Sequence, residues 1–226
     1  VNAGQVVSAM DNFLSKPGNL VDGVTVSLFE IMFASDDVEA THVIAFTGDP
    51  DAMNAVSDEM LDGIWSCLNE VEDSKSNIKC LVITGEGRGF CAGANLSGGS
   101  DRSNTGRQDA GHRLETGYHP ILRRIKNLKI PIITSVNGPA AGVGMSLALM
   151  GDMILAGKSA FFLQAFRRIG LVPDGGSTWL LPRLVGMARA KELAILGERL
   201  SAEKAFEWGL VNRLYEDNEL HKETLK

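Results

Sequence analysis

The sequence of residues 130–150 is IPIITSVNGPAAGVGMSLALM, and this stretch decides the fold class. Its first seven residues form an apolar, β-branched run that predicts a buried strand, with Pro131 near the start, where a missing N–H is tolerated. A glycine-bearing turn follows at residues 137–144, and residues 145–150 predict a helix. A strand that leads through a glycine turn into a helix is typical of α/β proteins.

A second glycine segment, GFCAGANL at residues 89–96, follows a predicted strand at residues 80–84. Small residues let a backbone approach a ligand closely, and N–H groups at a helix start carry partial positive charge. Two such N–H groups converging on one oxygen would stabilise an enolate or a tetrahedral oxyanion. The alternative is that both segments are tight turns between strands and helices, with no ligand.

The rest of the chain also alternates strands with helices, which predicts an α/β fold. Strands are expected at residues 24–33, 41–46, 80–84, 130–136, 153–156 and 210–214, with the first two forming a hairpin. Helices are expected at residues 57–71, 114–128, 145–150, 188–196 and 201–208.

Composition excludes several classes of protein. The net charge of -6 argues against nucleic acid or an anionic membrane surface as a partner. No segment has the ~18 uninterrupted apolar residues of a membrane-spanning helix, and the first residues lack the pattern of a signal peptide. Three cysteines without a CxxC pair indicate a reduced, cytoplasmic setting.

Three shorter motifs suggest other chemistry. Gly142-x-Gly144 is half of a dinucleotide fingerprint whose third glycine is missing, and Gly157-Lys158-Ser159 imitates a P-loop with the wrong spacing. His112, Glu115 and His119 share a helix face, which is a pattern for metal ligands. Because no third strong ligand is evident, we expect no metal and a polar helix face, with a role for His119 near an active site as the alternative.

Further segments complete an ordered series. PDAMNA at residues 50–55 precedes the glycine segments, and GLVPDGGSTWLLPRLVG at 170–186, LSAEKA at 200–205 and WGLV at 208–211 follow them. In this order the segments resemble the crotonase superfamily, the enoyl-CoA hydratases and isomerases, over residues 43–214. The resemblance implies a spiral of ββα turns, an acyl-CoA thioester as substrate and a homotrimer or hexamer. It implies no cofactor, since coenzyme A is part of the substrate.

The resemblance also implies a domain organisation. Residues 1–22 are expected to be an N-terminal extension, residues 23–214 the acyl-CoA-binding core, and residues 215–226 a truncated tail. Family members continue with C-terminal helices that cover the pocket and make subunit contacts, so this helical part is expected to be short or missing.

The resemblance assigns the oxyanion-binding N–H groups to Cys91 and Val143. The expected substrate-binding residues also lie mostly in the matching segments. They are Met53, Asn54, Ala55, Ala92, Gly93, Ala94, Gly142, Ser146, Phe166 and His119.

Two departures from the family pattern concern the proton chemistry. Hydratases carry two glutamates, and the matching positions here are Ser146 and Phe166. Asp174 is the carboxylate that remains, and the resemblance suggests an isomerase that moves a proton with one Asp. To titrate usefully near neutral pH, Asp174 should lie among apolar residues such as Leu171, Val172 and Trp179.

Several alternatives stay open at this point. Asp174 could be only a turn-forming residue before Gly175-Gly176. The chain could also be a hydratase, a hydrolytic or dehalogenating member of the family, or a CoA-binding protein without turnover.

Overall fold

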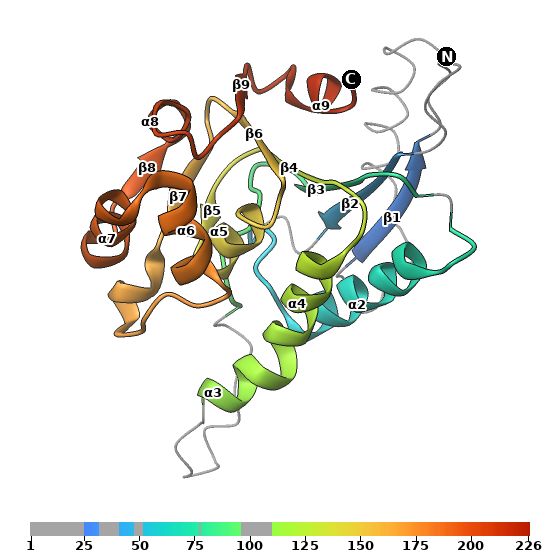
Figure 1. Ribbon diagram of the computed structural model, residues 1–226, viewed down its shortest axis with the longest axis horizontal. Helices are drawn as coiled ribbons and strands as arrows, with labels where there is room; N and C mark the ends of the chain where they lie inside the picture. The colour runs from blue at the N-terminus through green and yellow to red at the C-terminus, as the bar shows by residue number, and fades with distance from the viewer. Residues whose placement is uncertain (1–24, 32–40, 48–51, 77, 96–109) are drawn as a thin grey trace.

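The computed structural model describes residues 25–31, 41–47, 52–76, 78–95 and 110–226 (Figure 1). The expected extension at residues 1–22 lies outside the described residues. The larger sheet comprises β1 (Thr25–Ile31), β2 (Thr41–Thr47), β3 (Leu81–Gly85), β4 (Ile132–Val136), β6 (Met153–Gly157) and β9 (Arg213–Tyr215). A smaller sheet comprises β5 (Ala140–Ala141), β7 (Phe161–Leu163) and β8 (Arg199–Ser201).

The helices fill the segments between these strands. They are α2 (Asp58–Glu72), α3 (Ala110–Arg113), the π-helix η1 (Leu114–Tyr118), α4 (His119–Asn127), α5 (Val143–Ala148), the 3-10 helix η2 (Ala165–Ile169), α6 (Ser177–Val185), α7 (Met187–Leu196), α8 (Ala202–Glu207) and α9 (Leu220–Thr224). The predicted α/β class is confirmed.

The larger sheet has the order β1-β2-β3-β4-β6-β9. β1 and β2 pair antiparallel, which confirms the predicted hairpin, and every other pair in this sheet is parallel. β3 is buried along its whole length, as expected for a parallel strand covered on both faces. Parallel pairing puts the carboxyl ends of β3 and β4 at one edge, and both glycine segments leave the sheet there.

The smaller sheet grows by one short strand with each turn of the chain. β4 leads to β5 and then α5, and β6 leads to β7 and then η2. β5 pairs with β7, and β7 pairs with β8. Isolated bridges between Cys91 and Ala140 and between Val56 and Ala94 extend this layer. The sequence-based expectation of a spiral of ββα turns is therefore confirmed.

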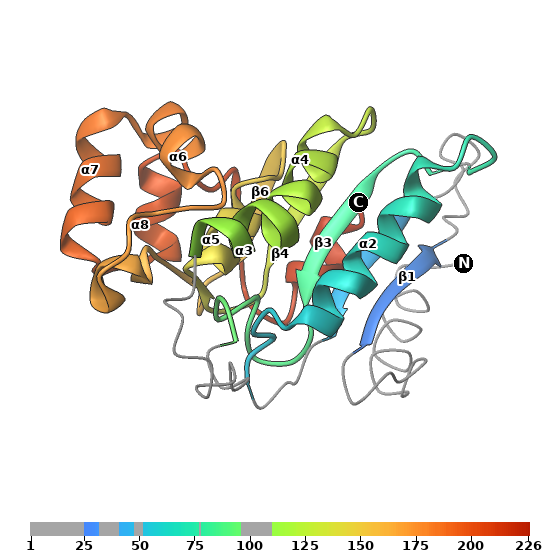
Figure 2. The ribbon, with the colours of Figure 1, turned by 90° about the horizontal axis from the view of Figure 1, so that it is seen from below.

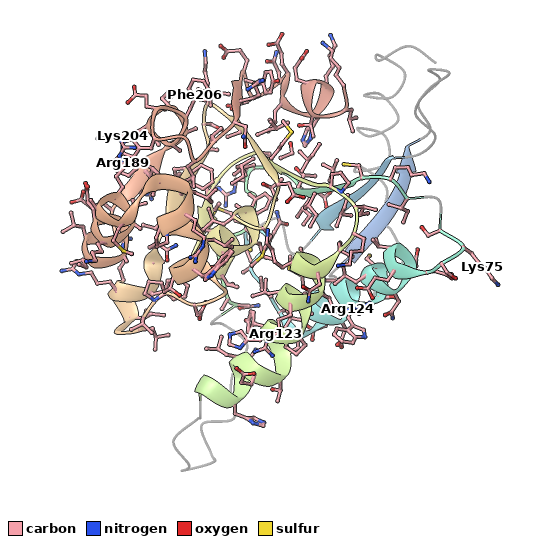
Figure 3. The ribbon with its side chains drawn as sticks, in the orientation of Figure 1. Lys75, Arg123, Arg124, Arg189, Lys204 and Phe206 are labelled. Carbon is pink, nitrogen blue, oxygen red and sulfur yellow. The ribbon has the colours of Figure 1, made fainter. Side chains whose placement is uncertain are left out.

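Helices α2 and α4 pack side by side (Figure 2). Ser57 caps α2 as predicted, because its hydroxyl accepts a hydrogen bond from the N–H of Met60 at 3.2 Å. Arg124 of α4 binds Glu72 of α2 at 2.8 Å and lies 4.3 Å from the centre of the Trp65 ring (Figure 3). The long helix that begins at Ala110 is thereby fixed to the edge of the core.

Helices α6, α7 and α8 gather beside the smaller sheet (Figure 1). Arg189 of α7 and Lys204 of α8 both lie over the ring of Trp208, 5.0 and 5.5 Å from its centre (Figure 3). The sequence analysis assigned no element to residues 158–187, where the structure has β7, η2 and α6.

The segment expected to be a truncated tail contains a helix that packs on the sheet. α9 contacts β4, β6 and β9, and its Leu220 and Thr224 are buried. The hydroxyls of Thr224 and Ser135 are 2.9 Å apart in the interior. Residues 220–224 are thus part of the fold. Of the helices in the described parts of the chain, none combines the length and apolar content that crossing a bilayer requires.

Candidate active site

The two glycine segments lie against each other, as the sequence predicted. The N–H of Ala141 donates to the carbonyl of Cys91 at 2.9 Å. A Cβ atom at Gly144 would overlap that same carbonyl, and one at Gly93 would lie 2.9 Å from the carbonyl oxygen of Ala141. Any side chain at Gly93 or Gly144 would therefore force the segments apart.

Val143 is the first residue of α5 and follows Gly142, whose φ of 54° favours glycine. An N–H in the first turn of a helix has no partner within the helix. The N–H of Gly142 donates to the carbonyl of Leu163 at 2.9 Å, whereas the N–H of Val143 has no acceptor among the described residues. The geometry is the one expected of an oxyanion donor.

The structure corrects the assignment of Cys91 as the second donor. The N–H of Cys91 already donates to the carbonyl of Pro139 at 3.0 Å, so it is not available to a substrate oxygen. Its side chain is fully buried, and burial raises the pKa of the thiol to about 12. Cys91 joins the two segments and offers no group to a ligand.

Ala94 has the backbone orientation that Cys91 lacks. Val56 donates its N–H to Gly93 at 2.7 Å and accepts from the N–H of Asn95 at 2.9 Å. In a strand-like segment the residue between two bonded neighbours directs its own N–H to the other side. The N–H of Ala94 has no acceptor among the described residues. The sequence named Ala94 as a substrate-binding residue, but no sequence signal identified its N–H as a donor.

The loop that carries Asp174 is pressed against the start of α5. Its carbonyl oxygen accepts hydrogen bonds from the hydroxyl of Ser146 at 3.0 Å, the hydroxyl of Ser177 at 2.8 Å and the N–H of Ser177 at 3.0 Å. A Cβ atom on Gly175, whose φ is 61°, would lie 2.7 Å from the Cβ of Ser146. Asp174 is therefore held close to the helix that begins at Val143.

The carboxyl group of Asp174 is half-buried, and its Oδ1 is buried without a hydrogen-bond partner in the described part of the chain. Burial raises the pKa of this carboxyl, and the charge of His119 opposes that effect. The direction of the shift matches the prediction, but the three apolar residues expected around this carboxyl are themselves exposed. Leu171, Val172 and Trp179 are 48%, 79% and 54% exposed, respectively.

Ser146 and Phe166, which stand where hydratases have glutamates, have structural roles in this chain. Ser146 is fully buried and uses its hydroxyl to hold the carbonyl of Asp174. Phe166 is buried, and its Cζ atom is 4.0 Å from the Cβ position of Gly142. Phe166 thus adds an apolar wall beside the helix start, and neither residue supplies a carboxylate.

Asn54 acts within the protein. Its side chain is fully buried and donates to the carbonyls of Glu86 at 2.9 Å and Gly89 at 2.8 Å. It thereby fixes the turn after β3, and its amide is not available to coenzyme A. The neighbouring Met53, Ala55 and Ala92 are partly exposed, so their contact with substrate stays a prediction.

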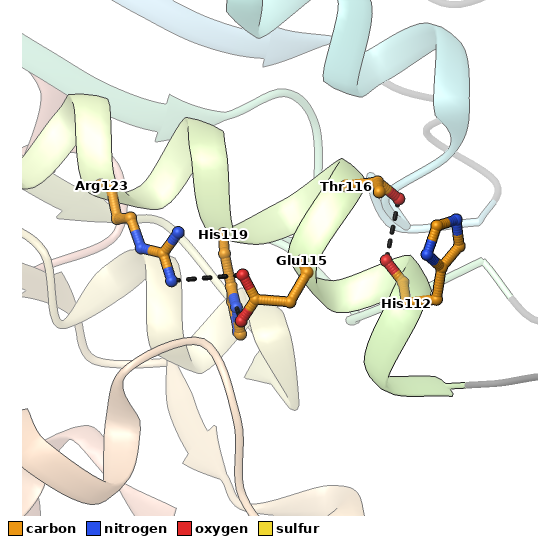
Figure 4. Close-up of polar contacts among 5 residues, drawn as sticks. All are labelled: His112, Glu115, Thr116, His119 and Arg123. Carbon is orange, nitrogen blue, oxygen red and sulfur yellow. Dashed lines mark hydrogen bonds and ion pairs between the residues drawn. The ribbon is translucent and has the colours of Figure 1, made fainter.

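His119 lies where the π-helix η1 passes into α4. Its N–H bonds to the carbonyl of Leu114, five residues back, and Pro120 next to it has no N–H to donate. The side chains of Glu115, His119 and Arg123 meet on one face of the helix, while those of His112 and Thr116 lie apart (Figure 4). No group of three or more potential metal ligands converges among the described residues.

Comparison with known proteins agrees with this architecture. The chain matches the enoyl-CoA hydratase/isomerase family model over residues 39–226, and it belongs to that family. The resemblance to the crotonase superfamily is thus confirmed.

Individual relatives cover much of the chain. It is 46% identical over 171 residues to 1,2-epoxyphenylacetyl-CoA isomerase from Escherichia coli, covering 76% of this chain and 65% of that protein. It is 41% identical over 166 residues to a probable enoyl-CoA hydratase from Rhodobacter capsulatus, covering 72% and 60%, respectively. The chain thus spans less than two thirds of the length of both relatives.

A solved structure of enoyl-CoA hydratase from Bacillus anthracis superposes with a TM-score of 0.76 at 27% identity. The superposition covers 90% of this chain and 74% of that one.

Proposed function

We propose that this protein isomerises the double bond of an enoyl-CoA, or of a ring-type aryl-CoA, thioester. The N–H groups of Ala94 and Val143 hold the thioester oxygen, and Asp174 removes the proton next to the thioester carbon. The observation that carries the proposal is the carboxylate of Asp174, whose loop is held by Ser146 of the helix that begins at Val143. The name of the E. coli relative, an isomerase of a CoA ester, agrees with it.

The two N–H groups supply the electrostatic part of the reaction. Removing the proton from C2 places negative charge on the thioester oxygen, and each positioned donor stabilises such a charge by ~3 kcal/mol. Both donors belong to backbone that is hydrogen-bonded on either side, so they are in place before the substrate binds.

Asp174 supplies the base. Burial raises the pKa of its carboxyl above the ordinary value of an aspartate, and this makes the carboxylate a stronger base. Isomerisation needs no activated water. The absence of carboxylates at Ser146 and Phe166, which the two-glutamate hydration mechanism requires, therefore does not hinder it.

Turnover of 3-enoyl-CoA to 2-enoyl-CoA by the wild type and by Asp174→Asn tests the proposal. Loss of a positioned proton-transfer group should lower kcat by about 10²–10⁴-fold. Running the reaction in ¹⁸O-labelled water separates the alternatives, because only hydration or hydrolysis places the label in the product. An Asp174→Asn variant with the wild-type rate, or a labelled product, would contradict isomerisation through Asp174.

A further inference from the structure

The imidazole of His119 is held in one orientation by Glu115. Its Nδ1 lies 2.8 Å from Oε1 of Glu115, one helical turn earlier, and Arg123 contacts the other oxygen of Glu115 at 3.4 Å. Figure 4 shows the carboxylate of Glu115 meeting both basic side chains. The Nε2 atom makes no hydrogen bond with any described residue. An imidazole fixed through Nδ1 presents Nε2 as its proton-exchanging atom.

The helix face that carries His119 leads to the loop of Asp174. Leu122 follows His119 by three residues, so both lie on the same face of α4. Its Cδ1 atom is 3.5 Å from the Cβ position of Gly175, the residue after Asp174. The charge of His119 favours a lower pKa of the Asp174 carboxyl, and the charge of Asp174 favours a higher pKa of the Tyr118 hydroxyl.

The proposed reaction needs two proton transfers at different carbons. One proton leaves C2 and another arrives at C4. Oδ1 of Asp174 is buried and has no hydrogen-bond partner among the described residues. With Asp174 alone, one half-buried carboxyl group would have to serve both carbons, and a second proton-transfer group removes that demand.

We propose that His119 is this second group and that Glu115 positions it, an inference that rests on the proposed function. The Asp174 carboxylate takes the proton from C2, and the electron pair of that C–H bond moves into the enolate. The dienolate then takes the proton of His119 Nε2 at C4. Asp174 afterwards releases its proton to solvent and His119 regains one, so the protein ends in its starting state.

A deuterium label distinguishes proton transfer by two groups, Asp174 and His119, from proton transfer by Asp174 alone. The probe is 3-hexenoyl-CoA with both hydrogens at C2 replaced by deuterium, and the product is analysed by mass spectrometry and NMR. In the wild type, C4 of the product should carry hydrogen from solvent. In His119→Gln, kcat should fall about 100-fold, and the remaining turnover should place deuterium from C2 at C4, because Asp174 then makes both transfers.

His112→Gln is the matched control. It changes the same side chain on the same helix, and His112 lies apart from Glu115 and His119 (Figure 4). Its rate and label pattern should equal those of the wild type. Deuterium at C4 in the wild type, or a His119→Gln rate equal to that of His112→Gln, would overturn the role of His119. Asp174→Asn would still be inactive in that case, so the proposed function would stand.

Two further measurements complete the test. Glu115→Gln should shift the pH profile of kcat, because it removes the carboxylate that holds Nδ1 of the imidazole, and a structural role alone would cause no such shift. The other charged groups near this pair are Arg123, which contacts Glu115, and Asp174, on which the charge of His119 acts. By ¹³C NMR of the Asp174 carboxyl, which requires no substrate, His119→Gln should raise its pKa and His112→Gln should not. An unchanged Asp174 titration in His119→Gln would refute the pairing even in a protein without turnover.

Discussion

The hydroxyl of Ser146 donates a hydrogen bond to the main-chain carbonyl of Asp174 at 3.0 Å and so ties helix α5 to the loop that carries the carboxylate. The tie joins the residue that follows the second glycine segment to the proposed base. In the hydratases that this sequence resembles, the matching position is a glutamate that binds water. Here Ser146 links the loop of the proposed base to the helix that begins at the proposed donor Val143.

Ser146→Ala should separate this positioning effect from general stability. The carbonyl of Asp174 keeps both donors of Ser177, so the free energy of unfolding should fall by only about 1 kcal/mol. We expect kcat to fall as well, because Asp174 loses its link to α5. Ser57→Ala, which removes the α2 cap at a similar cost of about 1 kcal/mol, is the control. Urea unfolding gives the stability of both variants. Equal kcat values in the two variants would contradict a positioning role for the Ser146–Asp174 hydrogen bond.

The backbone N–H of Ala94 can be deleted without changing its side chain. Lactic acid incorporated at position 94 replaces the N–H by an ester oxygen, and kcat should fall by about 10²–10³-fold. Lactic acid at position 91 removes the hydrogen bond from this N–H to the carbonyl of Pro139. Compared with Cys91→Ala, which has the same side chain, it should lower the free energy of unfolding by about 1 kcal/mol. A larger loss of kcat at 91 than at 94 would reinstate Cys91 as the donor.

Gly144→Ala should weaken both the fold and the site. The new Cβ would overlap the carbonyl oxygen of Cys91, and relieving the overlap should cost about 1–3 kcal/mol in the free energy of unfolding. Turnover should fall too, because the glycine segments must move apart. Gly117→Ala is the control: its Cβ has 3.6 Å to Leu61, and it should gain about 0.5–1 kcal/mol. Thermal unfolding and kcat of both variants test this expectation.

Asp174→Asn should make the protein more stable at neutral pH while it lowers turnover. Burial raises the pKa of the folded-state carboxyl, so the native state binds more protons than the unfolded chain above about pH 4. Wild-type stability therefore falls as the pH rises through the raised pKa, and Asn removes that loss.

The measurement is Tm at pH 4 and pH 7. The exposed Asp62→Asn serves as control, because it makes the same exchange of a carboxyl for an amide at the surface. If the Tm of Asp174→Asn at pH 7 does not exceed that of the wild type, burial does not destabilise the charged carboxylate.

The course of the chain could be predicted from local pattern because each signal acts within a few residues. The hydroxyl of Ser57 before an amphipathic run predicted the start of α2, and apolar runs placed β3 and β4 to within two residues. Residues 220–224 were missed because a helix of five residues has almost no periodicity to detect. α6 was missed because Pro182 lies inside it and Gly175-Gly176 precede it.

Within the site, the partners of backbone groups could not be predicted. Cys91 and Ala94 lie in one short segment, and only the register with Ala140 and Val56 decides which N–H is open. That register depends on residues 38 and 49 positions away in the sequence. In the same way, Val172 is apolar in sequence yet 79% exposed, whereas Gly175 of the same loop packs against Ser146.

The proposed oxyanion site is made of backbone amides, and the genetic code cannot exchange an amide for another group. Point mutations at Ala94 or Val143 alter side chains while leaving an N–H in place for every residue except proline. Substitutions at Ser146, Phe166, Asp174 and His119 can therefore add or remove acids and bases while these backbone N–H groups persist. A scaffold of this kind allows one lineage to acquire new reactions of CoA esters by a few side-chain exchanges.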